Sequence, residues 1–183
     1  MILVHLAKGF EEIEAVTVTD ILRRAGLDAH FVSVYPSREV VGAHGIVIDA
    51  DYLYQDIDYG LCEMIVLPGG LPGADNLQAH EGLRQHVKCF AADSSKKLAA
   101  ICAAPQVFGA CGILEGKNAT IYPGMESHLA GGNATGKNVT VDGNIITGMG
   151  PALAMEFALK LVEEIKGKEA AEEVAQGLLY DRV

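Results

Sequence analysis

The chain lacks the features that mark several large classes of protein. Its four cysteines stand at irregular gaps with no Cys-x-x-Cys pair, so neither a zinc site nor a disulfide framework is predicted, and a reducing cytoplasm is the expected location. Basic residues are scarce: the net charge is −10 and the pI is near 4.9, unlike the basic surfaces that bind nucleic acid. No Gly-x-Gly-x-x-Gly follows a strand-like run and no Gly-Lys-Ser/Thr occurs, so no phosphate-binding loop is predicted. We therefore expect no metal, no cofactor and no nucleic acid partner.

Long apolar runs are absent as well. No segment reaches the roughly 20 apolar residues that span a membrane. The N-terminal run at 1–7 has no basic lead and is too short for a signal peptide. We expect neither secretion nor a membrane partner.

The composition that is present is typical of one globular domain. The chain of 183 residues is 50% hydrophobic and contains 21 glycines and six prolines. A domain of this size buries on the order of 70% of its unfolded surface. No internal repeat, low-complexity tract or linker composition divides the chain, so we expect a single domain over residues 1–183.

Strand-like runs alternate with helix-like segments along the chain. Strands are predicted at 2–7, 29–34, 64–67 and 98–102, with a weaker one at 119–122, and hairpins at 40–48 and, around an Asp142-Gly143 turn, at 139–146. Helices are predicted at 11–25, 75–94 with a candidate break at Gly82, 105–111, 150–165 and 169–178, and a helical turn at 125–130. This alternation predicts an α/β fold, a doubly wound and mostly parallel sheet with helices on both faces.

One cysteine stands where a predicted strand gives way to a helix. The apolar run at 98–101 stops at Cys102, and Pro105 suits the first turn of a helix. This is the arrangement of a nucleophile elbow, in which the free N–H groups of Ala103 and Ala104 and the positive end of the helix favour a thiolate. The alternative is that Cys102 is simply a small buried apolar residue.

Two other predicted strand ends carry unusual residues. Gly69 and Gly70 follow the strand at 64–67, and Lys8-Gly9 follows the first strand and leads to Glu14. The carboxyl ends of parallel strands share one edge of a sheet, so these residues and Cys102 are predicted to meet in one crevice. There the N–H groups of the two glycines and of Ala103 could form an oxyanion hole. The alternative for the glycines is an ordinary strand-to-helix turn.

An acidic residue of the first helix is a candidate partner for the cysteine. Glu14 lies at the margin of the apolar stripe of the helix at 11–25, which places it half buried. Glu11 fits nearly as well, so periodicity does not choose between them. The alternative for both is an exposed acidic first turn.

Four sequence blocks together resemble a known family. AKGFEEIEAV at 7–16, IVLPGG at 65–70, AICAAP at 100–105 and GMGPA at 148–152 resemble, in order and spacing, the ThiJ/PfpI superfamily, and within it the branch of the Parkinson-disease-associated deglycase and redox chaperone. The resemblance implies a flavodoxin-like fold, a homodimer, Cys102 as nucleophile, and Glu14 as a protonated carboxyl facing it. It also implies that Gly69, Gly70 and Ala103 surround the reacting oxygen.

Two positions depart from relatives in the superfamily. Its peptidase branch has histidine after the cysteine, where this chain has Ala103, so peptidase activity is not expected. The deglycase branch often has histidine before a proline at the position of Tyr122, and tyrosine is a poor proton acceptor at pH 7. Tyr122 is therefore only a possible auxiliary residue. His44 and His128 are the candidates to replace the histidine, and the sequence places neither near the sulfur.

The sequence thus favours a cytoplasmic cysteine enzyme of the glyoxalase and deglycase type. Its partner is expected to be a small α-oxoaldehyde or the early adduct that such a carbonyl forms with a protein. The second hypothesis is a redox sensor or chaperone in which Cys102 is oxidised and turnover is incidental. A binding module that uses the same crevice is the third.

Overall fold

The computed structural model describes residues 1–180 and is built on a seven-stranded sheet. The strand order is β10-β11-β7-β6-β1-β2-β5, and every neighbouring pair is parallel except β10 with β11. The central strands β1, β6 and β11 are buried along their whole length, as apolar parallel strands covered on both faces must be. The strands are β1 (Ile2–Leu6), β2 (Ala29–Ser33), β5 (Tyr52–Leu53), β6 (Met64–Leu67), β7 (Lys97–Ile101), β10 (Val139–Asp142) and β11 (Ile145–Gly148).

The parallel part of the sheet has flavodoxin-like topology. The strands β2, β1, β6, β7 and β11 lie side by side, which is the order 2-1-3-4-5 of the doubly wound fold. The strand order reverses between β1 and β6, and ligands of such sheets bind beyond the carboxyl ends of the strands at that point. The two loops there are in contact, because the N–H of Glu11 donates to the carbonyl of Gly69 at 2.9 Å. The predicted fold class is confirmed.

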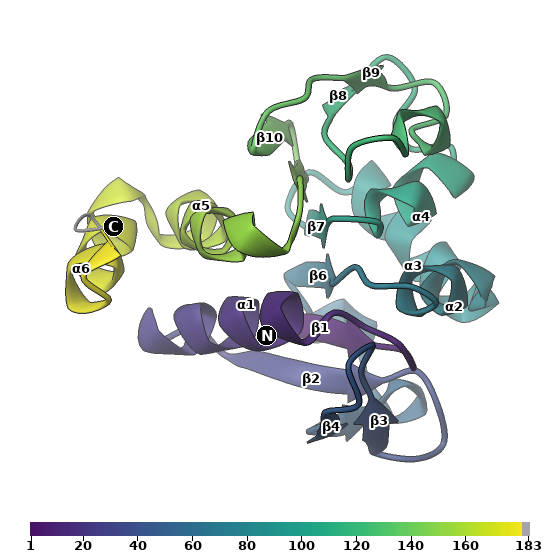
Figure 1. The fold of residues 1–183 in the computed structure, drawn as a ribbon, viewed down its shortest axis with the longest axis horizontal. Coiled ribbons are helices and arrows are strands. Elements are labelled where there is room, and N and C mark those ends of the chain that lie inside the picture. The colour runs from purple at the N-terminus through teal and green to yellow at the C-terminus, as the bar shows by residue number, and fades with distance from the viewer. Residues whose placement is uncertain (181–183) are drawn as a thin grey trace.

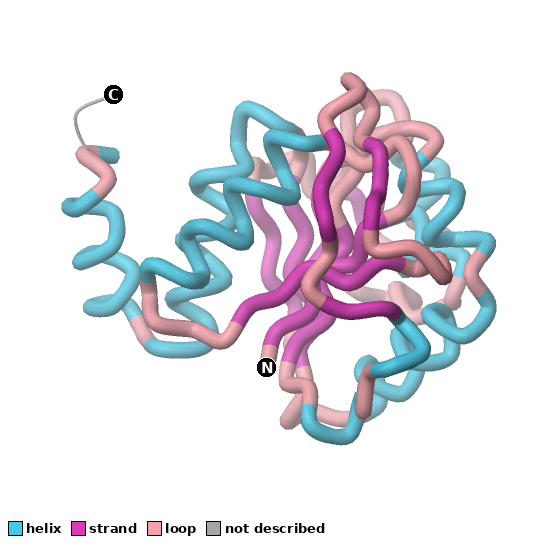
Figure 2. The backbone as a smooth tube through the Cα atoms, turned by 90° about the horizontal axis from the view of Figure 1, so that it is seen from below, coloured by secondary structure: helices cyan, strands magenta, loops and turns pink. Residues whose placement is uncertain are grey.

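Helices cover both faces of this sheet (Figure 1). One face carries α1 (Glu12–Arg24) and α5 (Ala154–Lys166), with α6 (Lys168–Gly177) packed against α5. The other carries α2 (Gly73–Ala79), α3 (Glu81–Ala92) and α4 (Pro105–Ala110). Figure 2 shows the strands running between these two groups of helices. Each face has its own apolar core.

Short elements complete the described chain. The hairpin predicted at 40–48 forms a separate two-stranded sheet, and a second small sheet pairs two short strands in parallel. These elements are β3 (Glu39–Val41), β4 (Val47–Asp49), β8 (Asn118–Ala119), β9 (Asn133–Ala134), and the 3₁₀ turns η1 (Tyr54–Asp56), η2 (Tyr59–Leu61), η3 (Glu126–His128) and η4 (Pro151–Leu153). No helix within residues 1–180 has both the length and the apolarity needed to cross a membrane.

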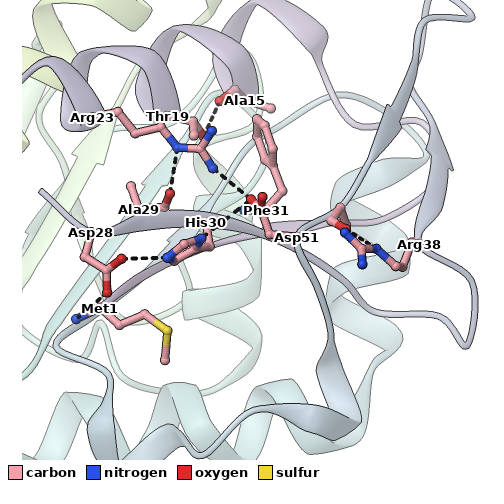
Figure 3. A network of polar contacts seen from close by, with 11 residues as sticks. Met1, Ala15, Thr19, Arg23, Asp28, Ala29, His30, Phe31, Arg38 and Asp51 are labelled. Atoms are coloured by element: carbon pink, nitrogen blue, oxygen red, sulfur yellow. Dashed lines mark hydrogen bonds and ion pairs between the residues drawn. The ribbon is translucent and has the colours of Figure 1, made fainter.

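An arginine fixes the C-terminal end of α1 to the edge of the sheet (Figure 3). The Nε of Arg23 donates to the carbonyl of Ala29 at 2.8 Å, and its Nη2 pairs with the Asp51 carboxylate at 2.8 Å. The same carboxylate accepts the N–H of Phe31, whose ring lies under the guanidinium. These contacts set the position of α1 on β2, and the first turn of that helix carries Glu14.

Among the element boundaries that differ from the prediction, three have a clear structural reason. The helix predicted at 75–94 is interrupted at His80 and not at Gly82, because His80 ends α2 in an extended conformation and its Nδ1 accepts the N–H of Leu83 to begin α3. The strand predicted at 119–122 ends at Ala119, since its pairing partner β9 has only two residues. The tight turn predicted at Asp142-Gly143 lies one residue later, because Asp142 pairs with Ile145.

Candidate active site

Cys102 occupies a strained position directly after β7. Its φ is 61°, in the left-handed region that non-glycine residues rarely adopt, and such residues concentrate at functional sites. Its N–H donates to the carbonyl of Gly148 and its carbonyl accepts the N–H of Tyr122, both at 2.9 Å. Pro105 opens α4 at its first position, as predicted. The backbone of the elbow is thus held from both sides.

One of the N–H groups assigned to the elbow is not free. The N–H of Ala104 donates to the carbonyl of Ile101 at 3.0 Å, because the chain makes a turn before α4 begins. The expectation that Ala104 faces the reacting atoms is therefore wrong. The N–H of Ala103 remains, and it lies within hydrogen-bond reach of the Cys102 sulfur, as does the N–H of Gly70.

Glu14 is the carboxyl that the fold brings to the cysteine. It lies in the first turn of α1 with 0% of its surface exposed. Its Oε2 accepts the N–H of Gly69 at 2.6 Å, while its Oε1 is buried with no hydrogen-bond partner among residues 1–180. Burial raises the pKa of Glu14 to about 7, against the lowering effect of the Gly69 and Cys102 hydrogen bonds. A carboxyl that is half protonated at neutral pH, with one oxygen unpaired, is suited to exchange a proton with a ligand.

Gly69 positions Glu14 and leaves room for Cys102. Its N–H is directed at the Glu14 carboxylate, which differs from the expected contribution to an oxyanion hole. A Cβ at this position would lie 2.6 Å from the Cys102 Cβ and 2.9 Å from Glu14 Oε2, both too close for real contacts. Only glycine allows the two functional side chains to approach each other here. The donors left for a reacting oxygen are therefore Gly70 and Ala103.

Cys102 and Glu14 form a coupled acid pair. Burial and the negative charge of Glu14 raise the pKa of the Cys102 thiol to about 12, while hydrogen bonds from Gly70 and Ala103 lower it. The sequence predicted a thiolate facing a protonated Glu14, and an ionised Glu14 opposes that thiolate. Because like charges in contact oppose each other, the pair loses its first proton near neutral pH and its second only at high pH.

Three side chains beside this site are of the types that bind metal ions and lie close together. Ligand atoms of Glu11, Glu12 and His44 lie within 4.8 Å of one another. The Glu12 carboxylate, however, already accepts the N–H of His44 at 2.7 Å and its Nδ1 at 2.9 Å. The Glu12 hydrogen bonds raise the pKa of the exposed His44, and the same bonds attach the β3–β4 turn to α1.

The tyrosine predicted to neighbour the cysteine does so through its backbone. Tyr122 donates its N–H to Cys102, and 47% of its surface is exposed. Neither His44 nor His128 forms a hydrogen bond with Cys102 among the described residues, since His44 binds Glu12 and His128 lies in η3. Sequence reasoning missed the backbone acceptor at Gly148, although this residue belongs to one of the four blocks that carry the family resemblance.

Comparisons with known proteins agree with this architecture. A family model described as the DJ-1/PfpI family matches residues 1–164. The structure "Toxoplasma gondii DJ-1, oxidized" superposes with a TM-score of 0.93 at 37% identity, covering 97% of each chain. The fold is thus that of this family.

Two relatives add information on length and activity. Protein DJ-1 homolog B of Arabidopsis thaliana is 42% identical over 179 residues, which are 97% of this chain but 41% of that protein. This chain therefore spans less than half the length of that plant relative. A protein of Caenorhabditis elegans named glutathione-independent glyoxalase DJR-1.2 is 34% identical over 164 residues, 87% of this chain and 84% of that one.

Proposed function

This chain belongs to the DJ-1/PfpI family, and on that premise we propose that it is a cysteine-dependent glyoxalase or deglycase acting on small α-oxoaldehydes or their early adducts. The observation that carries the proposal is the buried Glu14 carboxyl, whose pKa is raised to about 7 beside Cys102. The name of the Caenorhabditis elegans relative supports the reaction class.

The proton shared by the pair is assigned to Glu14. The sulfur has two N–H donors, from Gly70 and Ala103, whereas the carboxyl has one, from Gly69. Donors stabilise the charged form of the group that accepts them, so the single negative charge is better placed on sulfur. A thiolate facing a protonated carboxyl is the reactive form.

The attack on the aldehyde follows from this arrangement. A lone pair of the Cys102 thiolate forms a C–S bond to the aldehyde carbon, and the carbonyl π electrons move to the oxygen. The Gly70 and Ala103 N–H groups stabilise that oxyanion, and Glu14 then gives it a proton, which yields a hemithioacetal and a carboxylate.

The same carboxylate completes the rearrangement. Glu14 takes the proton from the hemithioacetal carbon, and the electrons of that C–H bond form the double bond of an enediolate. Glu14 returns the proton to the neighbouring carbon, while the hemithioacetal hydroxyl gives its proton to the former carbonyl oxygen, so a thioester of a 2-hydroxy acid forms. Water hydrolyses the thioester and releases the acid and the thiolate, and the proton left from water returns to the Glu14 carboxylate. A pKa near 7 lets one group act as acid and as base in turn, so no histidine is required at position 122.

The test is conversion of methylglyoxal to lactate by the purified protein without glutathione. We expect conversion that Cys102→Ser abolishes, because serine is not ionised at neutral pH. Equal lactate formation by the serine variant would refute the proposal. The proposal would also be refuted if the unmodified protein formed no lactate.

A second role, redox sensing, is supported by the contrast between Cys102 and the other cysteines. Burial raises the pKa of the Cys62 and Cys111 thiols, and their sulfurs face the backbone carbonyls of Asp58 and Arg84. The Cys102 sulfur instead lies within reach of two backbone N–H groups, those of Gly70 and Ala103. The structural relative from Toxoplasma gondii was solved in an oxidised form. The proposed thiolate at Cys102 has N–H donors that would equally hold sulfinate oxygens.

Peroxide should therefore oxidise Cys102 before the other cysteines. We expect mass spectrometry of peptides, after graded peroxide treatment, to find sulfinate at Cys102 while Cys62 and Cys111 remain thiols. Cys89 is exposed and serves as the reference for an ordinary accessible thiol. Oxidation of Cys89 ahead of Cys102 would contradict the sensor role without affecting the test of turnover.

We also propose a homodimer that uses an exposed apolar surface beside α1. Ile13 and Val16 of α1 and Ile46 and Val47 of the β3–β4 hairpin are all exposed, and the two elements are joined where Glu12 accepts the N–H of Ile46. Exposed apolar patches of this kind mark interaction surfaces.

The substitution Ile13→Asp should produce a monomer. Light scattering should measure twice the 19.4 kDa mass of one chain for the unmodified protein, and the mass of one chain for the variant. The reason is that burying an unpaired aspartate charge in an apolar interface costs free energy and opposes association. Leu61→Asp is the control, since Leu61 is exposed in η2, before the start of β6, and should leave the dimer intact. A dimeric Ile13→Asp protein would rule out this surface.

A further inference from the structure

An apolar groove opens beside the elbow that carries Cys102. It has a volume of about 420 Å³ and is lined by side chains of two segments, 122–123 and 149–153. The side chains that shape it are Tyr122, Pro123, Met149, Pro151 and Leu153. A phenyl or branched alkyl group is small compared with this volume.

Both walls of the groove are attached to the backbone of Cys102. Tyr122, on one wall, donates its N–H to the Cys102 carbonyl, and Gly148, which precedes the other wall, accepts the Cys102 N–H, both at 2.9 Å. The polar groups of the site follow β1 and β6: Glu14 lies in the first turn of α1, and the Gly69 N–H belongs to the loop after β6. β11 lies on the other side of β7. The elbow therefore separates a polar half of the site from an apolar half.

The electrostatics of the groove favour a neutral apolar ligand. None of its lining residues is an aspartate, glutamate, lysine, arginine or histidine. The chain has a net charge of −10, and the field of the whole protein therefore opposes an anionic substituent. The Tyr122 ring packs near the backbone of Gly150 and offers an aromatic face.

We propose that this groove receives the substituent of the oxoaldehyde, so that the protein selects aryl and bulky alkyl oxoaldehydes, with Tyr122 as the residue that determines the selectivity. The inference rests on the proposed function and names its substrate class. With the aldehyde carbon at the sulfur and its oxygen at Gly70 and Ala103, the remaining substituent extends to the apolar half.

The measurement is kcat/KM for phenylglyoxal divided by kcat/KM for methylglyoxal. Using this ratio within each variant removes effects on the chemical step that both substrates share. Tyr122→Ala should lower the ratio about tenfold, as the loss of a few apolar contacts does in other enzymes, and Tyr122→Phe should preserve it. Leu153→Asp should also lower it, and because position 153 is the N-cap of α5, aspartate is compatible with folding there. Tyr52→Ala, at an exposed tyrosine of β5, is the control and should leave the ratio unchanged.

The outcomes separate the two proposals. Turnover that depends on Cys102, with a ratio unchanged in Tyr122→Ala and Leu153→Asp, overturns the groove assignment alone. A ratio that falls equally in Tyr52→Ala also overturns it. If neither oxoaldehyde is converted by the unmodified protein, the proposed function fails, and this inference fails with it.

Discussion

Replacing Glu14 with glutamine is expected to lower turnover of methylglyoxal by about 10²–10⁴, which is the usual contribution of a positioned acid or base. Glutamine keeps the size of the side chain and can accept the Gly69 N–H, so the packing of the site is retained. It has no proton to give to the oxyanion and cannot take one from carbon. The loss should appear in kcat.

The same substitution should stabilise the fold at high pH. The folded-state pKa of Glu14 is raised from 4.5 to about 7, so the folded protein holds this proton more tightly than the unfolded chain. Below pH 4.5 the carboxyl is neutral in both the folded and the unfolded protein, so it does not lower the free energy of unfolding. As pH rises from 4.5 to 7, ionisation increasingly favours the unfolded chain, and the cost reaches roughly 3 kcal/mol at about 1.36 kcal/mol per pH unit.

Urea unfolding at pH 5 and pH 8 measures this difference. The Glu14→Gln protein should gain stability relative to the unmodified protein mainly at pH 8. Glu11→Gln is the matched control, since the Glu11 carboxylate faces His44 and not the cysteine, and it should not reproduce the pH-dependent gain. Identical effects of the two substitutions would mean that Glu14 is not the perturbed carboxyl.

The choice between these two glutamates shows where sequence reasoning stopped. Both lie on the buried side of the first turn, and periodicity alone could not separate them. The structure distinguishes the two glutamates through Gly69, whose N–H donates to Glu14 although the two residues are more than 50 positions apart in the sequence. A contact between a helix and a loop that follow two different strands depends on sheet order and register, which a helical pattern does not contain.

The elbow, by contrast, was predictable because its signals are local. A buried apolar run, a cysteine and a proline at the first helical position are neighbours in sequence, and the structure has β7, the strained Cys102 and α4 in that order. What local signals could not give was the thiol pKa. It depends on the charge of Glu14, which reaches Cys102 only through the tertiary fold.

Gly69→Ala should greatly lower turnover, although the substitution adds only one methyl group. The new Cβ would lie 2.6 Å from the Cys102 Cβ, 2.9 Å from the Ala103 nitrogen and 2.9 Å from Glu14 Oε2. Relieving these overlaps moves the nucleophile, an oxyanion donor and the proton carrier apart together. A displacement of about 1 Å costs on the order of 10² in rate, so turnover should fall at least that far. Overpacking of this kind also destabilises a fold by about 1–3 kcal/mol.

Gly177→Ala is the control for this substitution, because a Cβ at that helical position meets no atom of residues 1–180 within 4 Å. It should leave turnover unchanged and stabilise the fold by about 0.5–1 kcal/mol. The Gly69→Ala protein should remain folded by circular dichroism, so a rate loss in it reports on geometry. The Gly69→Ala protein should also lose the selective oxidation of Cys102, since the donors that hold the thiolate have moved. A folded Gly69→Ala protein with nearly normal turnover would show that Glu14 and Cys102 do not act as a closely spaced pair.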